Sequence, residues 1–264
     1  MNNILEARDL NITLLKNKNL IVKNVSFNVG KGKVLGIVGE SGSGKTLTCK
    51  AIMKLLNKKI FALSGRVKLK GDDILQMSER QVKTIIGKDI SMIMQNPMTA
   101  FDPMMKIGNQ IVETIRAHTS LSKKQAYAMG VCKLEEMNLN RVSEMMNSYP
   151  HTLSGGMLQR IMIAISLLLE PSVIIADEAT TALDVKTQSI ILDEFKRIRD
   201  SGIGLIVVTH DFGVIAKIAD DVIVMKGGRI VESGTVHQIF YNPKVKYTKA
   251  LLNARFLVDE ASYA

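Results

Sequence analysis

The spacing of hydrophobic and polar residues differs among three successive stretches of this chain. In the first stretch, short apolar runs rich in β-branched residues, such as 34–38 and 90–94, predict buried strands. From residue 96 to 150 the apolar positions recur only at helical spacing, so we expect helices and no strand there. After Pro150, strand-like runs and helical patterns alternate again. The pattern therefore predicts an all-helical insertion within a fold of alternating strands and helices.

The individual elements follow from the same patterns. Strands are predicted at 34–38, 65–71, 90–94, 173–177 and 205–209, with a strand pair around a polar turn within 5–29 and a hairpin at 222–231. Helices are predicted at 46–53, 78–86, 107–118, 122–137, 141–147, 185–199, 212–219 and 247–254. Such alternation predicts a mostly parallel sheet covered on both faces. We expect an α/β core at 1–95 and 156–240 that includes an antiparallel β subdomain, an all-α subdomain at 96–155, and a helical tail at 241–264.

The composition is that of an ordinary globular protein and disfavours several classes. The most apolar stretch, 161–169, is too short to cross a bilayer, and the N-terminal residues do not start a targeting segment. Cys49 and Cys132 lie in apolar helical patterns, so we expect buried thiols in a reducing cytoplasm and no disulfide, zinc site or iron–sulfur cluster. The formal charge of +10 suits nucleic acid, an anionic membrane or phosphate ligands. The spread of the lysines and the lack of Trp make a nucleic-acid groove the weaker interpretation.

A glycine-rich stretch follows the strand predicted at 34–38 and leads into a helical pattern. It matches the phosphate-binding P-loop pattern G-x-x-x-x-G-K-[ST] with the residues Gly39, Glu40, Ser41, Gly42, Ser43, Gly44, Lys45 and Thr46. A strand, a glycine loop and a helix in this order aim several backbone N–H groups at one point, at the positive end of the helix dipole. We expect Lys45 to contact the terminal phosphates of a nucleoside triphosphate and the Thr46 hydroxyl to bind Mg²⁺.

Two acidic residues, Asp177 and Glu178, end the apolar strand predicted at 173–177. Ligands of α/β sheets bind at the carboxyl ends of the strands. We therefore expect Asp177 to hold Mg²⁺, mostly through water, and Glu178 to polarise the water that attacks the γ-phosphate. The alternative is an acidic pair that only caps the next helix. A P-loop needs an acidic partner of this kind, which favours the catalytic interpretation.

A third motif, residues 153–160, opens the apolar helical pattern that follows it. Ser154 is a good helix N-cap residue, and Gly155 and Gly156 allow a phosphate to approach the backbone closely. On its own, a Ser-Gly-Gly helix start occurs often by chance. Together with the P-loop and the acidic strand end, it predicts a second anion site in the same chain.

These motifs resemble those of the nucleotide-binding subunits of ATP-binding-cassette (ABC) transporters, in the same order and over nearly the whole chain. The resemblance implies that residues 153–156 are the family signature, which binds the ATP held by the opposite subunit of a head-to-tail dimer. It also implies that Gln95 is the Q-loop glutamine that senses Mg²⁺ and the membrane partner. Residues 181–184, which end in Asp184, resemble the D-loop, and His210 resembles the switch histidine.

The position of His210 agrees with that role. It directly follows an apolar strand, at the same sheet edge as Glu178, within reach of a γ-phosphate as a hydrogen-bond donor. The other histidines, His118, His151 and His237, are expected to be ordinary surface or core residues.

The resemblance also implies a fold, ligands and partners. The fold would be a P-loop (RecA-like) parallel sheet with an antiparallel β subdomain and an inserted all-α subdomain. The ligands would be ATP and Mg²⁺. The partners would be two transmembrane permease subunits, a second ATP-binding subunit (identical or a paralogue) and, indirectly, an extracytoplasmic solute-binding protein, with no nucleic acid. Such a subunit lies peripherally on the cytoplasmic face of the cell membrane.

Finer features resemble one group of importers. The Q-loop region at 92–103, the signature helix start at 153–160 and the closing segment at 241–252 are similar to those of peptide and nickel importers, with the nickel type most similar. The solute stays open at this point. A soluble ABC ATPase acting on nucleic acid or the ribosome is the alternative. Such proteins usually carry a long coiled coil or a second cassette, and we expect neither here. A nucleotide sensor without turnover is disfavoured by Glu178 and His210.

The chain departs from the family pattern in two places. Ala179 replaces the Pro that usually follows the catalytic Glu, and no aromatic residue precedes Phe27, so we expect apolar base contacts near Leu15 or Ile21. Two methionine pairs, 104–105 and 145–146, are expected to be adaptable packing surface and not ligands of a soft metal.

Overall fold

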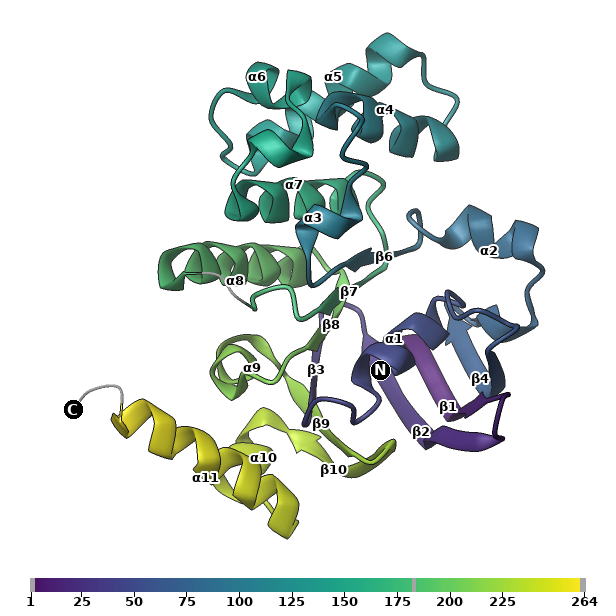
Figure 1. The fold of residues 1–264 in the computed structure, drawn as a ribbon, viewed down its shortest axis with the longest axis vertical. Coiled ribbons are helices and arrows are strands. Elements are labelled where there is room, and N and C mark those ends of the chain that lie inside the picture. Colours follow the sequence, from purple (N-terminus) through teal and green to yellow (C-terminus); the bar gives the residue numbers. More distant parts are fainter. Residues whose placement is uncertain (1–2, 182–183, 262–264) are drawn as a thin grey trace. The chain divides into compact units, whose positions relative to one another are not determined.

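The computed structural model describes residues 3–181 and 184–261, with side chains described up to residue 254 (Figure 1). The chain forms two compact units. The first consists of Met1–Met77 and Leu192–Ala264, and the second of Ser78–Ile191. The division falls inside one helix, α8 (Val185–Asp200).

The first unit contains two sheets. One is antiparallel with the strand order β2-β1-β4-β5, and the other has the order β10-β9-β3-β8 within this unit (Figure 1). The strands are β1 (Asn3–Leu14), β2 (Asn19–Gly30), β3 (Val34–Val38), β4 (Phe61–Leu69), β5 (Asp72–Asp73), β8 (Gly204–Val208), β9 (Asp221–Lys226) and β10 (Arg229–Thr235). The helices are α1 (Lys45–Ile52), the short η1 (Ile74–Gln76), α9 (Phe212–Ile218), α10 (Val236–Tyr241) and α11 (Lys246–Ala261).

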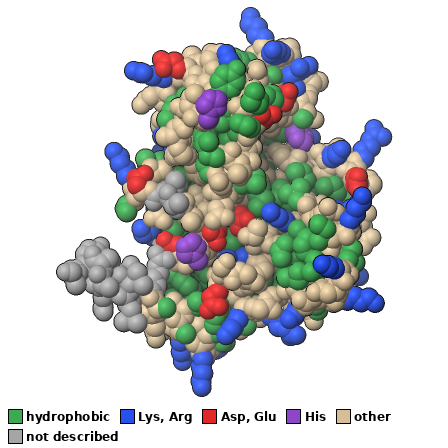
Figure 2. All heavy atoms as spheres, viewed as in Figure 1, with side chains coloured by type: hydrophobic (Ala, Val, Ile, Leu, Met, Phe, Trp, Pro, Cys, Tyr) green, Lys and Arg blue, Asp and Glu red, His purple; other side chains and the backbone are tan. Residues whose placement is uncertain are grey.

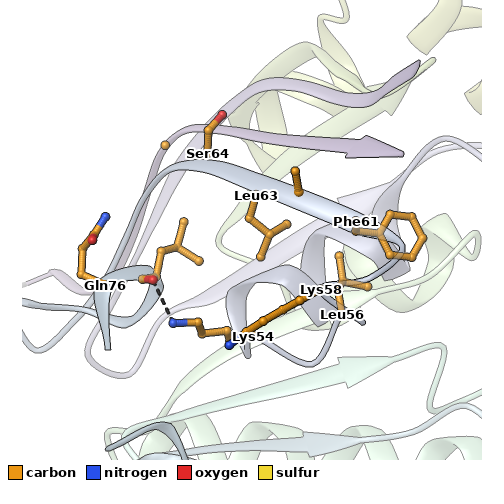
Figure 3. Close-up of a pocket in the computed structure, with 10 residues that line it drawn as sticks. Lys54, Leu56, Lys58, Phe61, Leu63, Ser64 and Gln76 are labelled. Atoms are coloured by element: carbon orange, nitrogen blue, oxygen red, sulfur yellow. Dashed lines mark hydrogen bonds between the residues drawn. The ribbon is translucent and has the colours of Figure 1, made fainter. Parts of the chain in front are cut away.

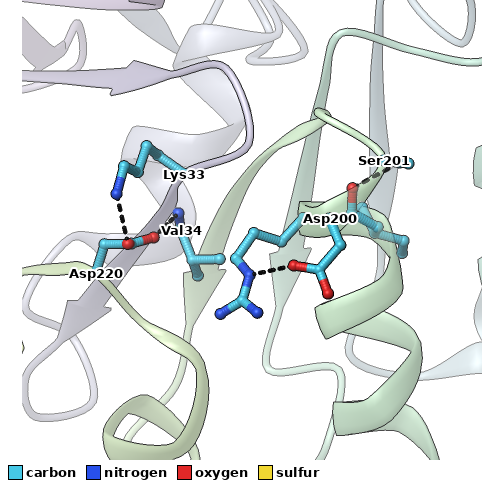
Figure 4. Close-up of polar contacts among 7 residues, drawn as sticks. Lys33, Val34, Asp200, Ser201 and Asp220 are labelled. Carbon is cyan, nitrogen blue, oxygen red and sulfur yellow. Dashed lines mark hydrogen bonds and ion pairs between the residues drawn. The ribbon is translucent and has the colours of Figure 1, made fainter.

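Strand β3 is buried along its whole length, as its unbroken apolar sequence predicts. It pairs in parallel with β8 and with β9. Its start is held by Asp220, whose carboxylate accepts hydrogen bonds from Lys33 Nζ and from the Val34 N–H, both at 2.8 Å (Figure 4). The hydrogen bond with Asp220 also raises the pKa of Lys33. Burial and pairing on both sides therefore fix the position of β3, and with it the start of the loop that follows.

The second unit combines a parallel strand pair with a group of helices. The strands β6 (Ile90–Ile93) and β7 (Val173–Asp177) pair in parallel, with Ile93 opposite Ala176. The helices are α2 (Glu79–Ile85), α3 (Pro97–Ala100), α4 (Ile107–His118), α5 (Lys123–Glu136), α6 (Val142–Asn147), the short η2 (Pro150–Thr152) and α7 (Gly155–Leu167). α4, α5 and α6 contact one another, and α7 contacts α3, α5 and β6 (Figure 1). No strand lies between residues 96 and 150, all of which are described.

Most of the predicted elements are confirmed. The strands predicted at 34–38 and 173–177 and the helix predicted at 107–118 have the same bounds as β3, β7 and α4. β4 begins at Phe61 instead of residue 65, and α11 continues to Ala261. The predicted α/β fold class is confirmed, with a parallel sheet, an antiparallel sheet and an inserted group of helices.

One prediction about the cysteines is wrong. Cys49 is buried in α1, but Cys132 is exposed. The reason is the rotation of α5, which buries only Ala126, Gly130 and Leu134 and leaves position 132 on another face of the helix.

The methionine pairs differ from each other. Met145 and Met146 are buried in the helical part of the second unit, which confirms a packing role. Met104, by contrast, is 82% exposed and is not part of the packed core.

The described surface is mixed in character. Lys and Arg side chains are distributed over the face in Figure 2 and do not gather into one patch there. No helix in the described ranges is long and apolar enough to span a membrane.

A cavity of about 600 Å³ lies in the first unit, lined by residues from the segment between α1 and β4, from β4 and from η1. Lys54 reaches along it and donates a hydrogen bond to the backbone carbonyl of Leu75 at 2.8 Å (Figure 3). It also donates one to the backbone carbonyl of Met77. This lysine therefore caps the η1 turn, and the cavity is not the expected nucleotide site.

Candidate nucleotide site

The P-loop joins β3 to α1 in the first unit. Gly39 has φ 152°, and a Cβ at this position would lie 2.2 Å from the carbonyl oxygen of Met225 on β9. Gly44 has φ 102° at the N-cap of α1, and a Cβ there would lie 3.1 Å from Cγ2 of Val22 on β2. Side chains at either position would be strained and crowded. The glycines of the motif are thus required by the close approach of the loop to two strands.

Lys45 is the first residue of α1, directly after the loop, and is 5% exposed. Its Nζ donates hydrogen bonds to the carbonyl oxygens of Gly39 at 2.7 Å and Glu40 at 2.9 Å. Both acceptors belong to the loop itself. These two hydrogen bonds keep the Lys45 ammonium group next to the loop backbone that is expected to surround the phosphates.

The residues of the loop fit a phosphate group. Ser43 is 5% exposed, and its buried Oγ has no hydrogen-bond partner. Leaving such a hydroxyl unsatisfied costs about 1–3 kcal/mol, which a phosphate oxygen would recover. The first N–H groups of α1 also lack acceptors within the helix and lie at its positive end. Thr46, half-buried in the first turn, suits the predicted Mg²⁺ ligand.

His210 lies at the same sheet edge as the P-loop. It follows β8, whose Val208 is opposite Ile37 of β3 in a parallel pair. The turn around it is fixed, because the buried Thr209 hydroxyl accepts the Asp211 N–H at 2.9 Å and Asp211 caps α9. The His210 side chain itself is exposed. A donor on a rigid turn at this edge suits the predicted contact with a γ-phosphate.

The second unit brings together Gln95 and Glu178. Parallel pairing of β6 and β7 places their carboxyl ends side by side, and each residue follows one of these ends. The Gln95 side chain donates a hydrogen bond from Nε2 to Glu178 Oε2 at 2.8 Å. The predicted base and the predicted Q-loop residue are thus direct partners.

The backbone of Glu178 is strained. Its φ is 49°, in the left-handed region that residues other than Gly rarely adopt. The Thr181 N–H donates to the Glu178 carbonyl at 3.0 Å, and the Thr181 hydroxyl lies 3.4 Å from Glu178 Oε2. Strain of this kind costs about 1–3 kcal/mol and is concentrated at functional sites. Eight other non-glycine residues in the described ranges also have a positive φ, so the strain agrees with a functional role for Glu178 and does not by itself identify one.

Asp177 and Asp184 have different surroundings. Asp177 is the last residue of β7 and is 5% exposed, which suits a carboxylate that meets a metal ion instead of bulk water. Asp184 accepts hydrogen bonds from the Thr187 hydroxyl at 2.6 Å and the Thr187 N–H at 2.9 Å, which lower its pKa. It therefore caps the start of α8, and its role toward a nucleotide stays a prediction. Residues 182 and 183 of the predicted D-loop lie outside the described residues.

The signature motif begins α7. Ser154 is its N-cap, with Oγ accepting the Met157 N–H at 3.3 Å, as expected for this residue type. A Cβ at Gly155 would meet nothing within 4 Å, whereas one at Gly156 would lie 3.1 Å from Cγ2 of Thr187. The backbone at Gly155 is thus open to an approaching group.

Two contacts around these motifs were missed by the sequence analysis. Gln159 is 1% exposed and donates from Nε2 to the Ala179 carbonyl at 2.9 Å, which fixes the residue after Glu178. A polar residue on the buried face of an apolar helix was the available signal. Tyr247 accepts a hydrogen bond from the Glu40 N–H at 3.3 Å, and no sequence pattern relates these two positions.

A glycine loop on a buried parallel strand, with a buried carboxylate at another strand end, defines a P-loop nucleotide-binding protein. The pattern of the ABC transporter family matches the chain over residues 22–181. The chain therefore belongs to the ABC transporter family.

Three characterised relatives are import or transport ATP-binding proteins. The metal-staphylopine import protein CntD of Staphylococcus aureus is 41% identical over 258 residues, covering 97% of this chain and 95% of that protein. The oligopeptide transport protein OppD of Bacillus subtilis is 42% identical over 253 residues, covering 94% and 71%. The glutathione import protein GsiA of Shigella dysenteriae is 42% identical over 261 residues, covering 96% of this chain. The chain spans only 42% of the length of GsiA.

Solved structures show the same fold. The dimeric cassette MJ0796, in a post-hydrolysis state with ADP and Pi, has a TM-score of 0.77 and 25% identity, covering 88% of this chain and 98% of that one. The transporter component cbiO1 from Clostridium perfringens has a TM-score of 0.76 and 24% identity, covering 97% and 96%. These likenesses agree with the P-loop fold predicted from the sequence.

Proposed function

We propose that this chain is the ATP-hydrolysing subunit of an ABC importer. The observation that carries the proposal is the Glu178 carboxylate, which follows the buried Asp177 at the end of β7 and accepts a hydrogen bond from Gln95 at 2.8 Å. A carboxylate held in this way suits a general base for water. The identity to import ATP-binding proteins supports the direction of transport.

The P-loop would bind the nucleotide. Lys45 and the first amides of α1 would contact the β- and γ-phosphates, and Ser43 would give its buried hydroxyl to a phosphate oxygen. Mg²⁺, when bound by Thr46, Gln95 and Asp177, would neutralise charge on the phosphates. Apolar residues near Leu15 and Ile21 would contact the base.

Hydrolysis would then depend on two residues. Glu178 would accept a proton from the attacking water, and His210 would donate a hydrogen bond to the transferring phosphoryl group. The fixed turn around His210 and the hydrogen bond to the Glu178 carboxylate support these roles because they hold each residue just after the carboxyl end of a strand.

A second cassette would complete the site. Ser154, Gly155 and Gly156 would bind the ATP of a partner subunit, with Asp184 nearby in the dimer. The open backbone at Gly155 and the dimeric state of MJ0796 support this arrangement. The partner cassette is an identical chain or a paralogue.

The membrane partners would be two permease subunits, with the chain bound peripherally at the cytoplasmic face of the membrane. An extracytoplasmic solute-binding protein would deliver the cargo to them. The relatives import glutathione, metal–staphylopine or oligopeptides, which makes a peptide or a metal complex the proposed class of cargo. The nickel complex favoured by the finer motif likeness falls within this class.

Transport coupling gives a test of the proposal. The segment from Gln95 to Asp102, with the helix α4 that follows it, would dock a cytoplasmic helix of a permease subunit. Met104 is 82% exposed, so Met104→Glu should leave folding intact, whereas the Asp102 carboxylate caps the Met104 N–H and is less suitable for substitution. The chain would be produced with candidate permease subunits from the same genome and reconstituted in liposomes.

We expect Met104→Glu to abolish ATP-driven solute uptake while basal ATPase activity stays within about twofold, because surface substitutions away from structured features rarely disturb the fold. Glu135→Gln, an exposed position on α5, serves as a control outside this surface. Failure of the wild-type chain to bind permease subunits, with binding to nucleic acid or ribosomes instead, would contradict the importer and favour a soluble ABC ATPase.

A further inference from the structure

The closing segment, residues 241–252, is hydrogen-bonded to strand β10 just before α11 begins. The Glu232 carboxylate on β10 accepts the backbone N–H groups of Lys244 at 2.6 Å and Val245 at 3.2 Å. Within α11, Thr248 and Leu252 are buried. Glu232 therefore holds the residues directly before α11, and the burial of Thr248 and Leu252 holds its first two turns.

Tyr247, in this first turn, extends to the P-loop. Its hydroxyl oxygen accepts a hydrogen bond from the Glu40 N–H at 3.3 Å. Lys226 Nζ lies 4.2 Å from the centre of the tyrosine ring, a cation–π contact that orients the ring. Burial raises the pKa of Tyr247, so the hydroxyl stays neutral at physiological pH.

Glu40, whose N–H group donates to Tyr247, makes two further hydrogen bonds within the P-loop region through its carbonyl oxygen. The carbonyl of Glu40 accepts a hydrogen bond from Lys45 Nζ at 2.9 Å and one from the Ser43 N–H at 3.2 Å. Its N–H is the donor to Tyr247. The backbone of one solvent-exposed residue is thus tied to the helix α11 on one side and to the phosphate-binding lysine on the other.

We propose that Tyr247 is a positioning residue for the nucleotide site, which fixes the Glu40 backbone and through it the P-loop and Lys45. This inference rests on the proposed ATP-binding function. Tyr247 touches no phosphate; it reduces the freedom that the loop would otherwise lose when ATP binds. It also makes the closing segment part of the nucleotide site, a role that the P-loop pattern gives no hint of.

The test compares two tyrosines of the same segment. Tyr247→Phe removes the hydroxyl and keeps the ring over Lys226. Tyr241→Phe is the matched control, because Tyr241 is 79% exposed and its ring, 4.8 Å from that of His237, survives the change. A third variant, Lys226→Met, removes the cation–π contact and keeps the hydroxyl. For each purified full-length chain, the MgATP Kd, the kcat and KM for hydrolysis, and the melting temperature would be measured.

We expect Tyr247→Phe to raise the MgATP Kd and the KM by about three- to tenfold, the range of one lost neutral hydrogen bond. Its kcat should stay within about twofold, because the loop contact is the same in the ground state and the transition state. Lys226→Met should have a smaller effect on Kd, and Tyr241→Phe none.

Three outcomes would overturn the inference. They are an unchanged Kd in Tyr247→Phe, an equal effect in Tyr241→Phe, and a Kd increase matched by a melting temperature so low that the protein is partly unfolded in the assay. A wild-type chain that binds no MgATP would instead refute the proposed function itself. The two failures are therefore distinguishable.

Discussion

The signature motif gives a sharp prediction because the structure separates its two glycines. A Cβ at Gly155 would meet nothing within 4 Å, so the substitution Gly155→Asp needs no rearrangement within the chain. Gly155 is also the first residue of α7, where an acidic side chain is favoured by about 0.3–1 kcal/mol through the helix dipole. The isolated chain should therefore keep its stability and its affinity for ATP.

The dimer should respond very differently. If the new carboxylate approaches the γ-phosphate of the partner's ATP to about 4 Å, two like charges repel by about 4 kcal/mol at an effective dielectric constant near 20. Since about 1.4 kcal/mol corresponds to a factor of ten, each site would weaken dimerisation by about 10³-fold. Gly155→Asn has the same shape without the charge and should dimerise nearly normally.

Gel filtration with ATP, in a Glu178→Gln background that prevents hydrolysis, would measure the dimer, and equilibrium titration would measure ATP binding to the monomer. Gly156→Asp is a second control. Its Cβ would lie 3.1 Å from Thr187, so it should lower the melting temperature, which Gly155→Asp should not. Loss of monomer ATP binding in Gly155→Asp, or dimerisation equal to that of the parent, would refute the proposal that the signature acts on a partner's nucleotide.

Three further predictions follow from the first unit. Lys45→Ala should raise the MgATP Kd by about 10²-fold or more, because the cation of the loop is lost, and an unchanged titration would contradict the P-loop assignment. His210→Ala should lower kcat by about 10²-fold while the Kd stays within threefold; a change in Kd alone would argue against a role in catalysis. Asp220→Asn should lower the melting temperature by about 2–4 °C by weakening the hold on Val34. The hydrogen bond and ion pair with Asp220 raise the pKa of Lys33 above its usual 10.5. The stability that this pair contributes should therefore be fully present below pH 10.5 and should be lost as the pH rises through the raised pKa. Thermal melts of both proteins against pH would measure this, and a difference that grows with alkaline pH would contradict it.

Local patterns predicted the elements well where one physical cause dominates. β3 and β7 are short apolar runs, and only full burial explains such runs, so their bounds follow from the sequence. The cap of α7 follows from Ser154, whose hydroxyl accepts a backbone N–H group in the structure. Cys132 was mispredicted because α5 has a weak apolar stripe, so its buried face is set by neighbouring helices.

The site needed information that no local pattern contains. Gln95 and Glu178 are 83 positions apart, and only the adjacency of β6 and β7 brings them within 2.8 Å. The strained φ of Glu178 depends on the hydrogen bonds of the turn after β7. Tyr247 reaches Glu40 because the closing segment is fastened to β10 by Glu232. Motif spacing predicts which residues are functional, and tertiary packing determines which of them touch.

If Glu178 is the base of an ATPase that works as a cassette dimer, Glu178→Gln should stop hydrolysis and leave the dimer intact. Gln keeps the length of the side chain and an oxygen that accepts the hydrogen bond from Gln95 Nε2, so the fold and ATP binding should persist. Only the charge that activates water is removed. With MgATP, we predict a dimer that persists in gel filtration and a phosphate-release rate lowered by about 10²-fold or more. Hydrolysis at the parent rate, or a chain that stays monomeric with ATP bound, would contradict the claim.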